Sequence, residues 1–225
     1  MGLSKIPGRT DYVEAVYRAL IDAISAGTLA PGERITQEDL AEQLNVSRSP
    51  VLQALRLLKK DGLLEEAPGR GLVVARLDPI RIGHLYQVRG ALEALAARLA
   101  AERKARIPQS LIDAGRKAAA GSDVNALIEA DMAFHRAIYE ASGNPYVLET
   151  QTLQWVHLRR VMGAVLQRST GRSGIWDEHA EILKAINDGN GELAATLSQQ
   201  HAQRAGAALV LHLEKNGSTP ERLVA

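Results

Sequence analysis

The sequence predicts a mainly α protein in which an N-terminal winged helix-turn-helix precedes a C-terminal antiparallel bundle of six helices. Three observations support this prediction. Residues 36–74 follow the order helix, tight turn, helix and β-hairpin. Beyond residue 78, apolar residues recur at helical spacing and the strand pattern ends. Aromatic residues make up only 4% of the chain, which suits packed helices better than a β-sandwich.

The length of the chain indicates two domains. At 225 residues the chain exceeds a typical single domain, so each part can bury a core of its own. We place the boundary near residue 77, just before Pro79, because the strand pattern stops there. The expected domains are residues 1–77 and 78–225.

Composition argues against secreted and membrane proteins. Cysteine is absent, so disulfides cannot stabilise the fold. The sequence shows neither a signal-type apolar segment at its start nor an uncharged apolar run of about 18 residues, the length of a membrane span. We therefore expect a cytoplasmic protein.

The distribution of charge is more informative than its total. The net charge of +1 gives no argument for a nucleic-acid partner. Residues 47–60, however, contain four basic side chains and no acidic one, whereas residues 33–42 contain four acidic side chains and one basic one. Positive charge is thus concentrated on the second helix of the motif.

A first helix is expected ahead of the motif, ending at Gly27, and residues 1–10 before it are expected to form a loose arm. The inward stripe of this helix consists of Val13, Val16, Leu20 and Ile24. The helix-turn-helix then begins at Thr36, an N-cap followed by Asp39 as in a capping box, and its first helix ends at Asn45.

The second helix of the motif begins at Ser47 or Ser49, either of which can cap it, and ends at Gly62. Pro50 is tolerated in its first turn. Its inward stripe is Val51, Leu55 and Leu58, and its outward stripe is Arg48, Leu52, Arg56 and Lys59. The outward stripe is the candidate face for a DNA groove, although such a stripe can also be an ordinary solvated face.

A β-hairpin follows this helix. The chain passes through Leu63–Glu66, turns at Pro68–Gly71 and returns through Leu72–Val74. A hairpin with a glycine-rich tip directly after a helix-turn-helix is the wing of a winged motif.

Residues 11–76 resemble the N-terminal domain of GntR-family transcription regulators. The resemblance rests on Pro31–Arg34, Asp39–Ala41, Val46–Val51 and Gly69–Gly71. It implies that Arg48 and Ser49 contact operator DNA and that Gly71 lies near the minor groove. One position departs from the pattern: Leu52 stands where many members carry an arginine. Leucine cannot make the bidentate guanine contact, so we expect a changed base preference at one step of each half-site.

The candidate DNA-contacting residues are therefore Arg34, Thr36, Ser47, Arg48, Ser49, Pro50, Leu52, Arg56, Lys59, Arg70 and Gly71.

Six helices are predicted after the boundary, separated by glycine and proline. They span residues 79–104, 109–120, 123–142, 146–167, 175–188 and 190–214. No local enzyme motif, such as a nucleotide-binding glycine loop, an HExxH pair or a nucleophile elbow, occurs in the sequence.

Four polar residues fall on the inward stripes of these helices: Asp131, His135, His179 and His201. Buried polar groups need partners, so the four are expected to meet one another. Three imidazoles and a carboxylate can hold Zn²⁺, Ni²⁺, Mn²⁺ or Fe²⁺. The alternative is that each histidine is a hydrogen-bonded core residue and Asp131 a cap or the partner of an arginine.

Two arginines also lie on apolar stripes. Arg89 shares a stripe with Leu85, and Arg159 shares one with Trp155. An anion is the natural partner of an inward guanidinium, so both are candidate effector-binding residues. The alternative is a buried salt bridge, for example with Glu93 or Asp131.

Residues 79–214 resemble the FCD effector domain of the FadR subfamily, in its six-helix VanR-like branch. The resemblance rests on Asp131, Phe134-His135, Glu178-His179, Ala185-Ile186, His201, Arg89 and Leu92-Glu93. It implies a metal at Asp131, His135, His179 and His201, and a small carboxylate or sugar acid bound at the metal and held by arginine.

Taken together, the sequence predicts a homodimeric DNA-binding regulator that binds a palindromic operator and is switched by a carboxylate. Leu85, Val88, Leu92, Leu95 and Leu99 form a near-heptad seam that can serve partly as core and partly as dimer surface. Two alternatives are a regulator that responds to the metal itself and, from another class, a metal-dependent enzyme. Against the enzyme, the inward ionisable residues are already needed as ligands or as an anion clamp.

Overall fold

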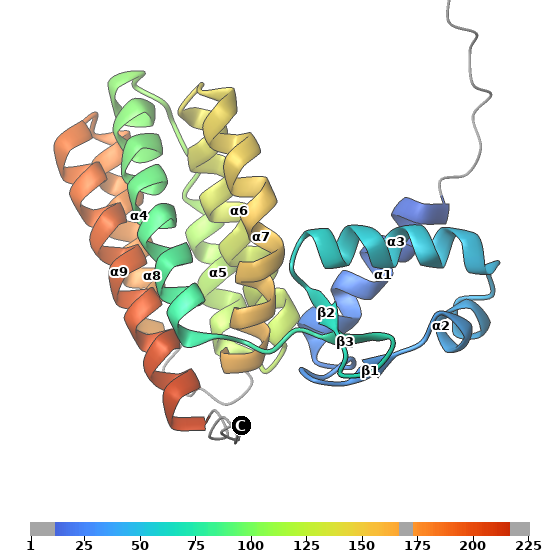
Figure 1. The fold of residues 1–225 in the computed structure, drawn as a ribbon. Helices are drawn as coiled ribbons and strands as arrows, with labels where there is room; N and C mark the ends of the chain where they lie inside the picture. Colours follow the sequence, from blue (N-terminus) through green and yellow to red (C-terminus); the bar gives the residue numbers. More distant parts are fainter. Residues whose placement is uncertain (1–11, 167–172, 217–225) are drawn as a thin grey trace, which may run out of the picture. The chain divides into compact units, whose positions relative to one another are not determined.

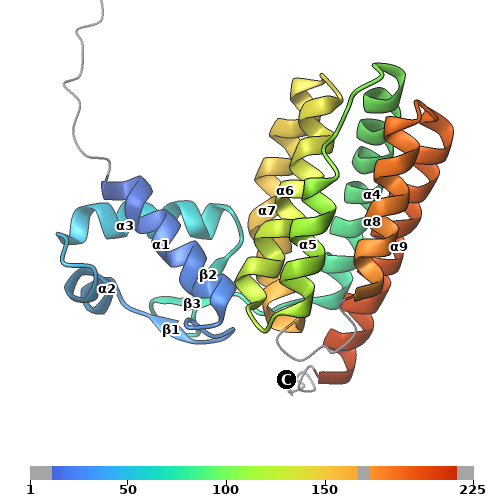
Figure 2. The same cartoon turned by 180° about the vertical axis from the view of Figure 1, so that it is seen from behind.

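The computed structural model describes residues 12–166 and 173–216 (Figures 1 and 2). The chain divides into two compact units, Met1–Arg76 and Leu77–Ala225. The predicted N-terminal arm, residues 1–10, lies outside the described residues, as does Gly171 in the predicted loop after the fourth bundle helix. No described helix is long and apolar enough to cross a lipid bilayer.

The first unit contains the three predicted helices and a small sheet. Its elements are α1 (Tyr12–Ala26), β1 (Arg34–Ile35), α2 (Gln37–Gln43), α3 (Arg48–Lys60), β2 (Leu64–Glu66) and β3 (Leu72–Val74). The predicted inward residues Val16, Leu20 and Ile24 of α1 are buried, as are Val51, Leu55 and Leu58 of α3. The two amphipathic helices thus pack on each other to form the core of this unit.

Helices α2 and α3 begin just after residues that the sequence predicts as N-caps, and α2 ends near Asn45, as predicted. Thr36 is the N-cap of α2, and its hydroxyl accepts a hydrogen bond from Asp39 N at 3.1 Å. Asn45 has φ of 50°, the left-handed conformation that ends the helix. Ser47, one of the two predicted caps, is the N-cap of α3, but its side chain makes no capping hydrogen bond.

The sheet has one strand more than the predicted hairpin. β2 and β3 pair antiparallel, with Leu64 opposite Val74, and β1 adds to the other edge of β3 with Ile35 opposite Leu72. A two-residue strand such as β1 is too short to show alternation, which is why sequence periodicity misses it. At the hairpin tip, Gly69 and Gly71 have φ of 91° and 98°, conformations that favour glycine.

The second unit is an all-helical bundle (Figure 1). Its helices are α4 (Pro79–Glu102), α5 (Ser110–Ala120), α6 (Val124–Ala141), α7 (Pro145–Leu166), α8 (Ser173–Asn187) and α9 (Gly191–Asn216). Every boundary lies within two residues of its predicted position. The fold class predicted from the sequence is confirmed.

Helices α4 and α9 pack closely side by side (Figures 1 and 2). Small residues permit the contact: a Cβ added to Gly206 would lie 2.7 Å from the Cβ of Tyr86. The buried face of α4 carries Tyr86, Arg89 and Glu93, so polar groups are placed in the centre of the bundle. In the predicted leucine seam, Val88 and Leu95 remain 50% and 40% exposed.

Candidate metal centre and nucleic-acid interface

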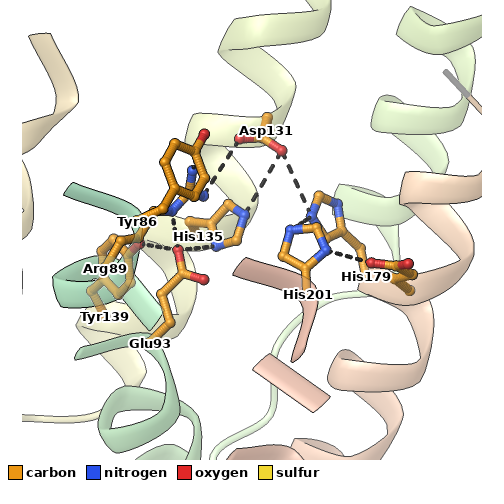
Figure 3. Close-up of polar contacts among 9 residues, drawn as sticks. Tyr86, Arg89, Glu93, Asp131, His135, Tyr139, His179 and His201 are labelled. Atoms are coloured by element: carbon orange, nitrogen blue, oxygen red, sulfur yellow. Dashed lines mark hydrogen bonds and ion pairs between the residues drawn. The ribbon is translucent and has the colours of Figure 1, made fainter. Parts of the chain in front are cut away.

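Three histidines from three helices meet in the centre of the bundle (Figure 3). His135 lies on α6, His179 on α8 and His201 on α9, and all three are buried. One ring nitrogen from each lies within 4.8 Å of the others. The Nε2 atoms of His179 and His201 are 3.1 Å apart.

Asp131 completes the predicted set of four. It lies one turn before His135 on α6, and its Oδ1 is 3.8 Å from His135 Nε2 and 3.6 Å from His179 Nε2. Helical spacing of four residues puts the carboxylate and the imidazole on one face. The structure therefore brings together all four residues that the sequence singled out.

Carboxylates outside the cluster orient two of the rings. His135 Nδ1 lies 3.1 Å from Glu93 Oε1, and His201 Nδ1 lies 2.8 Å from Glu178 Oε2. A carboxylate on Nδ1 fixes the ring so that Nε2 is available to a metal. Among the described residues, His135 Nε2 is buried and has no hydrogen-bond partner. A metal ion at this point would satisfy that nitrogen, so the donor set fits a metal.

The electrostatics of the cluster favour neutral imidazole at His179. Burial lowers the pKa of His179 well below its usual range, and His201 and His135 add to the shift. A neutral imidazole has the free lone pair that a metal requires. Nitrogen and oxygen donors without thiolate suit Zn²⁺, Ni²⁺, Mn²⁺ or Fe²⁺.

Arg89 lies beside the cluster and is only 2% exposed. Its Nε is 2.6 Å from Glu93 Oε1 and its Nη2 is 3.9 Å from Asp131 Oδ2. Glu93 and Asp131, the two carboxylates considered as salt-bridge partners of Arg89, therefore both lie beside it. The guanidinium also lies over the Trp155 ring, at 5.3 Å from its centroid.

Two tyrosines complete this network, and sequence reasoning missed both. Arg89 Nη1 donates to the hydroxyl of Tyr86 at 3.2 Å, and Tyr139 donates its hydroxyl proton to Glu93 Oε1 at 2.9 Å (Figure 3). Burial and the charge of Glu93 raise the pKa of Tyr139, so its hydroxyl stays protonated. The sequence did contain a signal for both tyrosines, because each lies one helical turn from a predicted site residue: Tyr86 from Arg89 and Tyr139 from His135.

Burial raises the pKa of Glu93, but Arg89 and His135 outweigh this effect and hold it well below the usual range of a carboxyl. Glu93 is therefore ionised and links the arginine, the histidine and Tyr139. Removing any one member leaves charged or polar groups buried without partners.

A cavity of about 340 Å³ opens beside the cluster. Arg89, Asp131 and His201 contribute to its wall. Arg159, the second predicted effector-binding residue, is not among the described residues that line it. Its Nη2 instead lies 3.0 Å from Glu129 Oε1. The structure therefore brings Arg89 to the cluster but not Arg159.

The candidate nucleic-acid face is exposed in the first unit. On α3, Arg48, Leu52, Arg56 and Lys59 lie opposite the buried stripe, as predicted. Arg48 Nη2 is 2.8 Å from Glu38 Oε1, and Lys59 Nζ is 2.6 Å from Glu66 Oε1. In the protein without DNA, Arg48 and Lys59 are therefore each paired with an acidic side chain.

The other candidates lie around α2, the start of α3 and the wing. Arg34 donates a hydrogen bond to the carbonyl of Arg70, and a Cβ on Gly71 would lie 3.5 Å from the Arg34 guanidinium. Arg34 thus supports the wing tip. The remaining exposed candidates are Thr36, Ser47, Ser49 and Arg70, and Pro50 is half-buried.

Comparison with known proteins agrees with both parts of this description. Residues 12–74 match the family of bacterial regulatory proteins called gntR, and residues 84–204 match the FCD domain. An HTH-type transcriptional regulator in an unstable DNA locus of Streptomyces ambofaciens is 30% identical over 204 residues, which cover 88% of this chain and 85% of that protein. The chain belongs to the GntR family.

Two further comparisons agree. A probable D-xylose utilization operon transcriptional repressor of Paenarthrobacter nicotinovorans is 27% identical, with 88% of each chain covered. The structure of E. coli McbR/YncC has the same fold, with a TM-score of 0.76, 24% identity, and coverage of 90% of this chain and 99% of that one. The protein is therefore a DNA-binding transcription regulator with an FCD effector domain, not an enzyme.

Proposed function

We propose that this GntR-family regulator binds a palindromic operator as a homodimer, and that a small carboxylate bound at a metal site in the FCD domain changes its affinity for DNA. The observation that carries the proposal is the buried cluster of Asp131, His135, His179 and His201, beside a cavity that also reaches Arg89.

In the first unit, residues 1–77 act as the DNA-binding domain. Arg48, Ser49 and Arg56 of α3 contact bases and phosphates in the major groove, and the wing at Gly71 lies against the minor groove. When the protein binds DNA, the Arg48 side chain leaves Glu38 and contacts the DNA instead. Leu52 offers an apolar contact that suits a thymine methyl better than a guanine.

In the second unit, residues 78–225 act as the effector and dimerisation domain. Asp131 and the three histidines hold a divalent metal, which when bound supplies a Lewis-acid site for an anion. Arg89 faces the same space with one of its amino groups 3.9 Å from Asp131. A carboxylate there gains a charge-assisted hydrogen bond from the guanidinium.

Dimer formation is proposed through α4. Val88 and Leu95, seven residues apart, are half-exposed on one side of this helix. A two-fold dimer puts two recognition helices about one turn of duplex apart, which requires an inverted-repeat operator. The effector then shifts the population of two dimer arrangements, and a difference of about 1–3 kcal/mol in its affinity for them is sufficient.

The experiment combines a thermal-shift screen with selected operator DNA. Purified protein is screened against small organic acids with its metal and after chelation, and stabilising acids are then added to the complex with an operator selected from random duplexes. We expect stabilisation that needs the metal and a change in operator affinity. Arg89→Lys should weaken the effect, whereas Arg159→Lys, at a residue that does not line the cavity, should not. Stabilising acids that leave operator affinity unchanged would refute the proposal.

A second candidate is a regulator that responds to the metal alone. It is favoured by the ion pair between Arg89 and Glu93, at 2.6 Å, because this pair already gives the guanidinium an anionic partner. In that case chelation changes operator affinity at constant salt, and no organic acid has an effect.

A further inference from the structure

We infer that the cavity takes a monocarboxylate with an apolar body, rather than a sugar acid or a dicarboxylate. This inference rests on the proposed function and names the chemical class of the effector. It follows from the make-up of the cavity wall, which is polar beside the metal cluster and mainly apolar elsewhere.

The apolar part of the wall is built by four helices. Leu127 comes from α6, Met162 and Val165 from α7, Trp176 from α8 and Leu209 from α9. Hydroxyl groups of a sugar acid held against these side chains would lose water without gaining hydrogen-bond partners, which is costly. A hydrocarbon body gains from the same contact, by about fourfold in affinity for each buried methylene.

Most of the polar part of the wall lies on the side of the metal cluster. Arg89 and Asp131 lie there, with His201, whose ring is oriented by Glu178. Arg204, from the next turn of α9, is 2.9 Å from the same Glu178. One polar group of the ligand therefore has several partners at this end. The other polar lining residues are Tyr86, which accepts from Arg89, and His212, against nine apolar ones.

The charges at this end match a single carboxylate. Arg89 and Arg204 face three carboxylates, those of Glu93, Asp131 and Glu178, in ion pairs. The protein groups therefore carry one net negative charge, which a divalent metal changes to one net positive charge. One ligand carboxylate balances that charge. A second carboxylate would exceed that charge and would lie in the mainly apolar part of the wall, where His212 is the polar lining residue.

The cavity volume sets the size of the body. At about 340 Å³ the cavity is near the small end of the range for small-molecule pockets. A short aliphatic or single-ring monocarboxylate fits this volume.

The test measures affinities of matched probes by titration calorimetry on the full chain reconstituted with Zn²⁺. The probes are acetate, butyrate, hexanoate, gluconate, adipate and uncharged hexanol. We expect the dissociation constant to fall by about two orders of magnitude from acetate to hexanoate, four methylenes in all. Gluconate, adipate and hexanol should each bind at least tenfold more weakly than hexanoate.

A cavity-filling variant locates the apolar part. Ala205 lines the cavity one turn after His201, so Ala205→Phe should lower hexanoate affinity at least tenfold and leave acetate binding within about threefold. Leu211→Phe is the matched control, because Leu211 is an exposed residue of the same helix. Its affinities should equal those of the unchanged protein. If Ala205→Phe weakens acetate and hexanoate equally, the apolar body does not occupy this space and the inference fails.

The outcomes separate the inference from the proposed function. If carboxylates bind but gluconate or adipate binds as tightly as hexanoate, the inference is overturned and the carboxylate-responsive regulator stands. If hexanol binds as tightly as hexanoate, the polar end does not select a carboxylate and the inference also fails. If no carboxylate binds to the metal-loaded protein, the proposed function itself is refuted.

Discussion

The two units of this regulator place their candidate functional residues in opposite environments. In the first unit, Arg48 and Lys59 are exposed, and their acidic neighbours contact them at the surface. In the bundle, Arg89, His179 and Glu93 are almost fully buried. A surface ion pair contributes little to stability, whereas breaking a buried one is costly. Substitutions of these candidate functional residues should therefore affect DNA binding alone in the first unit, but stability and ligand binding together in the bundle.

The largest effect is expected at Glu93. Glu93→Ala leaves Arg89 buried without the partner at 2.6 Å, so the free energy of unfolding should fall by about 3–5 kcal/mol. Urea denaturation of the metal-free protein measures this. Glu140→Ala, which removes an exposed partner of Arg136, should change it by no more than about 0.5 kcal/mol. Equal losses in the two variants would erase the contrast between buried and exposed pairs.

Metal removal should have a comparable effect on the bundle. At a free metal concentration a thousand times the dissociation constant, binding adds about 4 kcal/mol, so chelation should lower the melting temperature by several degrees. His179→Gln should abolish this response. His84→Gln, at an exposed histidine of α4, should retain it. A chelator response that survives in His179→Gln would show that the metal binds elsewhere.

The bundle also shows how far sequence reasoning extends. Helical periodicity was sufficient to predict that Asp131, His135 and His179 face inward, because a polar residue on an apolar stripe is a strong signal. For the second candidate arginine, periodicity overestimated how deeply the side chain is buried. Arg159 was predicted to face inward, but it is about a quarter exposed, while the adjacent Arg160 is buried. Neighbouring helical residues differ by about 100° in direction, and periodicity cannot place the edge of a stripe that finely.

The first unit shows the complementary limit. Local motifs predicted α2, α3 and the hairpin, because caps and glycine turns depend on neighbouring residues. The pairing of β1 with β3 depends on residues nearly forty positions apart, Arg34 with Val73, and two residues carry no periodicity. Long-range contacts made by very short elements are therefore the part of the fold that sequence alone does not give.

Arg48→Ala tests the exposed region. Loss of one direct contact to a base should weaken operator binding by about 1–3 kcal/mol, with stability changed by no more than about 0.5 kcal/mol. Fluorescence anisotropy on a selected operator measures the change in DNA affinity, and urea denaturation measures the change in stability. Arg18→Ala removes an exposed arginine of α1 and should leave operator affinity unchanged. A large loss of stability in Arg48→Ala would contradict the separation of the two roles.

A smaller effect is expected between α1 and the end of α3. Tyr17 donates a hydrogen bond to Asp61 Oδ2 at 2.7 Å in a partly buried position. Tyr17→Phe should lower the stability of the first unit by about 1 kcal/mol without changing metal binding. Tyr12→Phe, at a tyrosine that is 55% exposed, is the control and should have no measurable effect. The same loss in both variants would mean that this hydrogen bond contributes nothing.

The smallest effect concerns Glu38, which competes with DNA for Arg48 across 2.8 Å. Glu38→Gln should strengthen operator binding by less than about 1 kcal/mol, because exposed pairs are weak. Glu42→Gln, at another exposed acid of the same helix, controls for the general loss of negative charge. Equal gains in the two variants would assign the effect to net charge rather than to the pair.

The central claim is that the buried cluster of the bundle controls the DNA affinity of the first unit. The most direct measurement is anisotropy of selected operator DNA with the Zn²⁺-loaded protein, with and without saturating amounts of the tightest-binding carboxylate among acetate, hexanoate and gluconate. We predict a change of about 5-fold to 150-fold in the dissociation constant, lost in Asp131→Asn. An identical dissociation constant with and without a carboxylate that demonstrably binds would contradict the account.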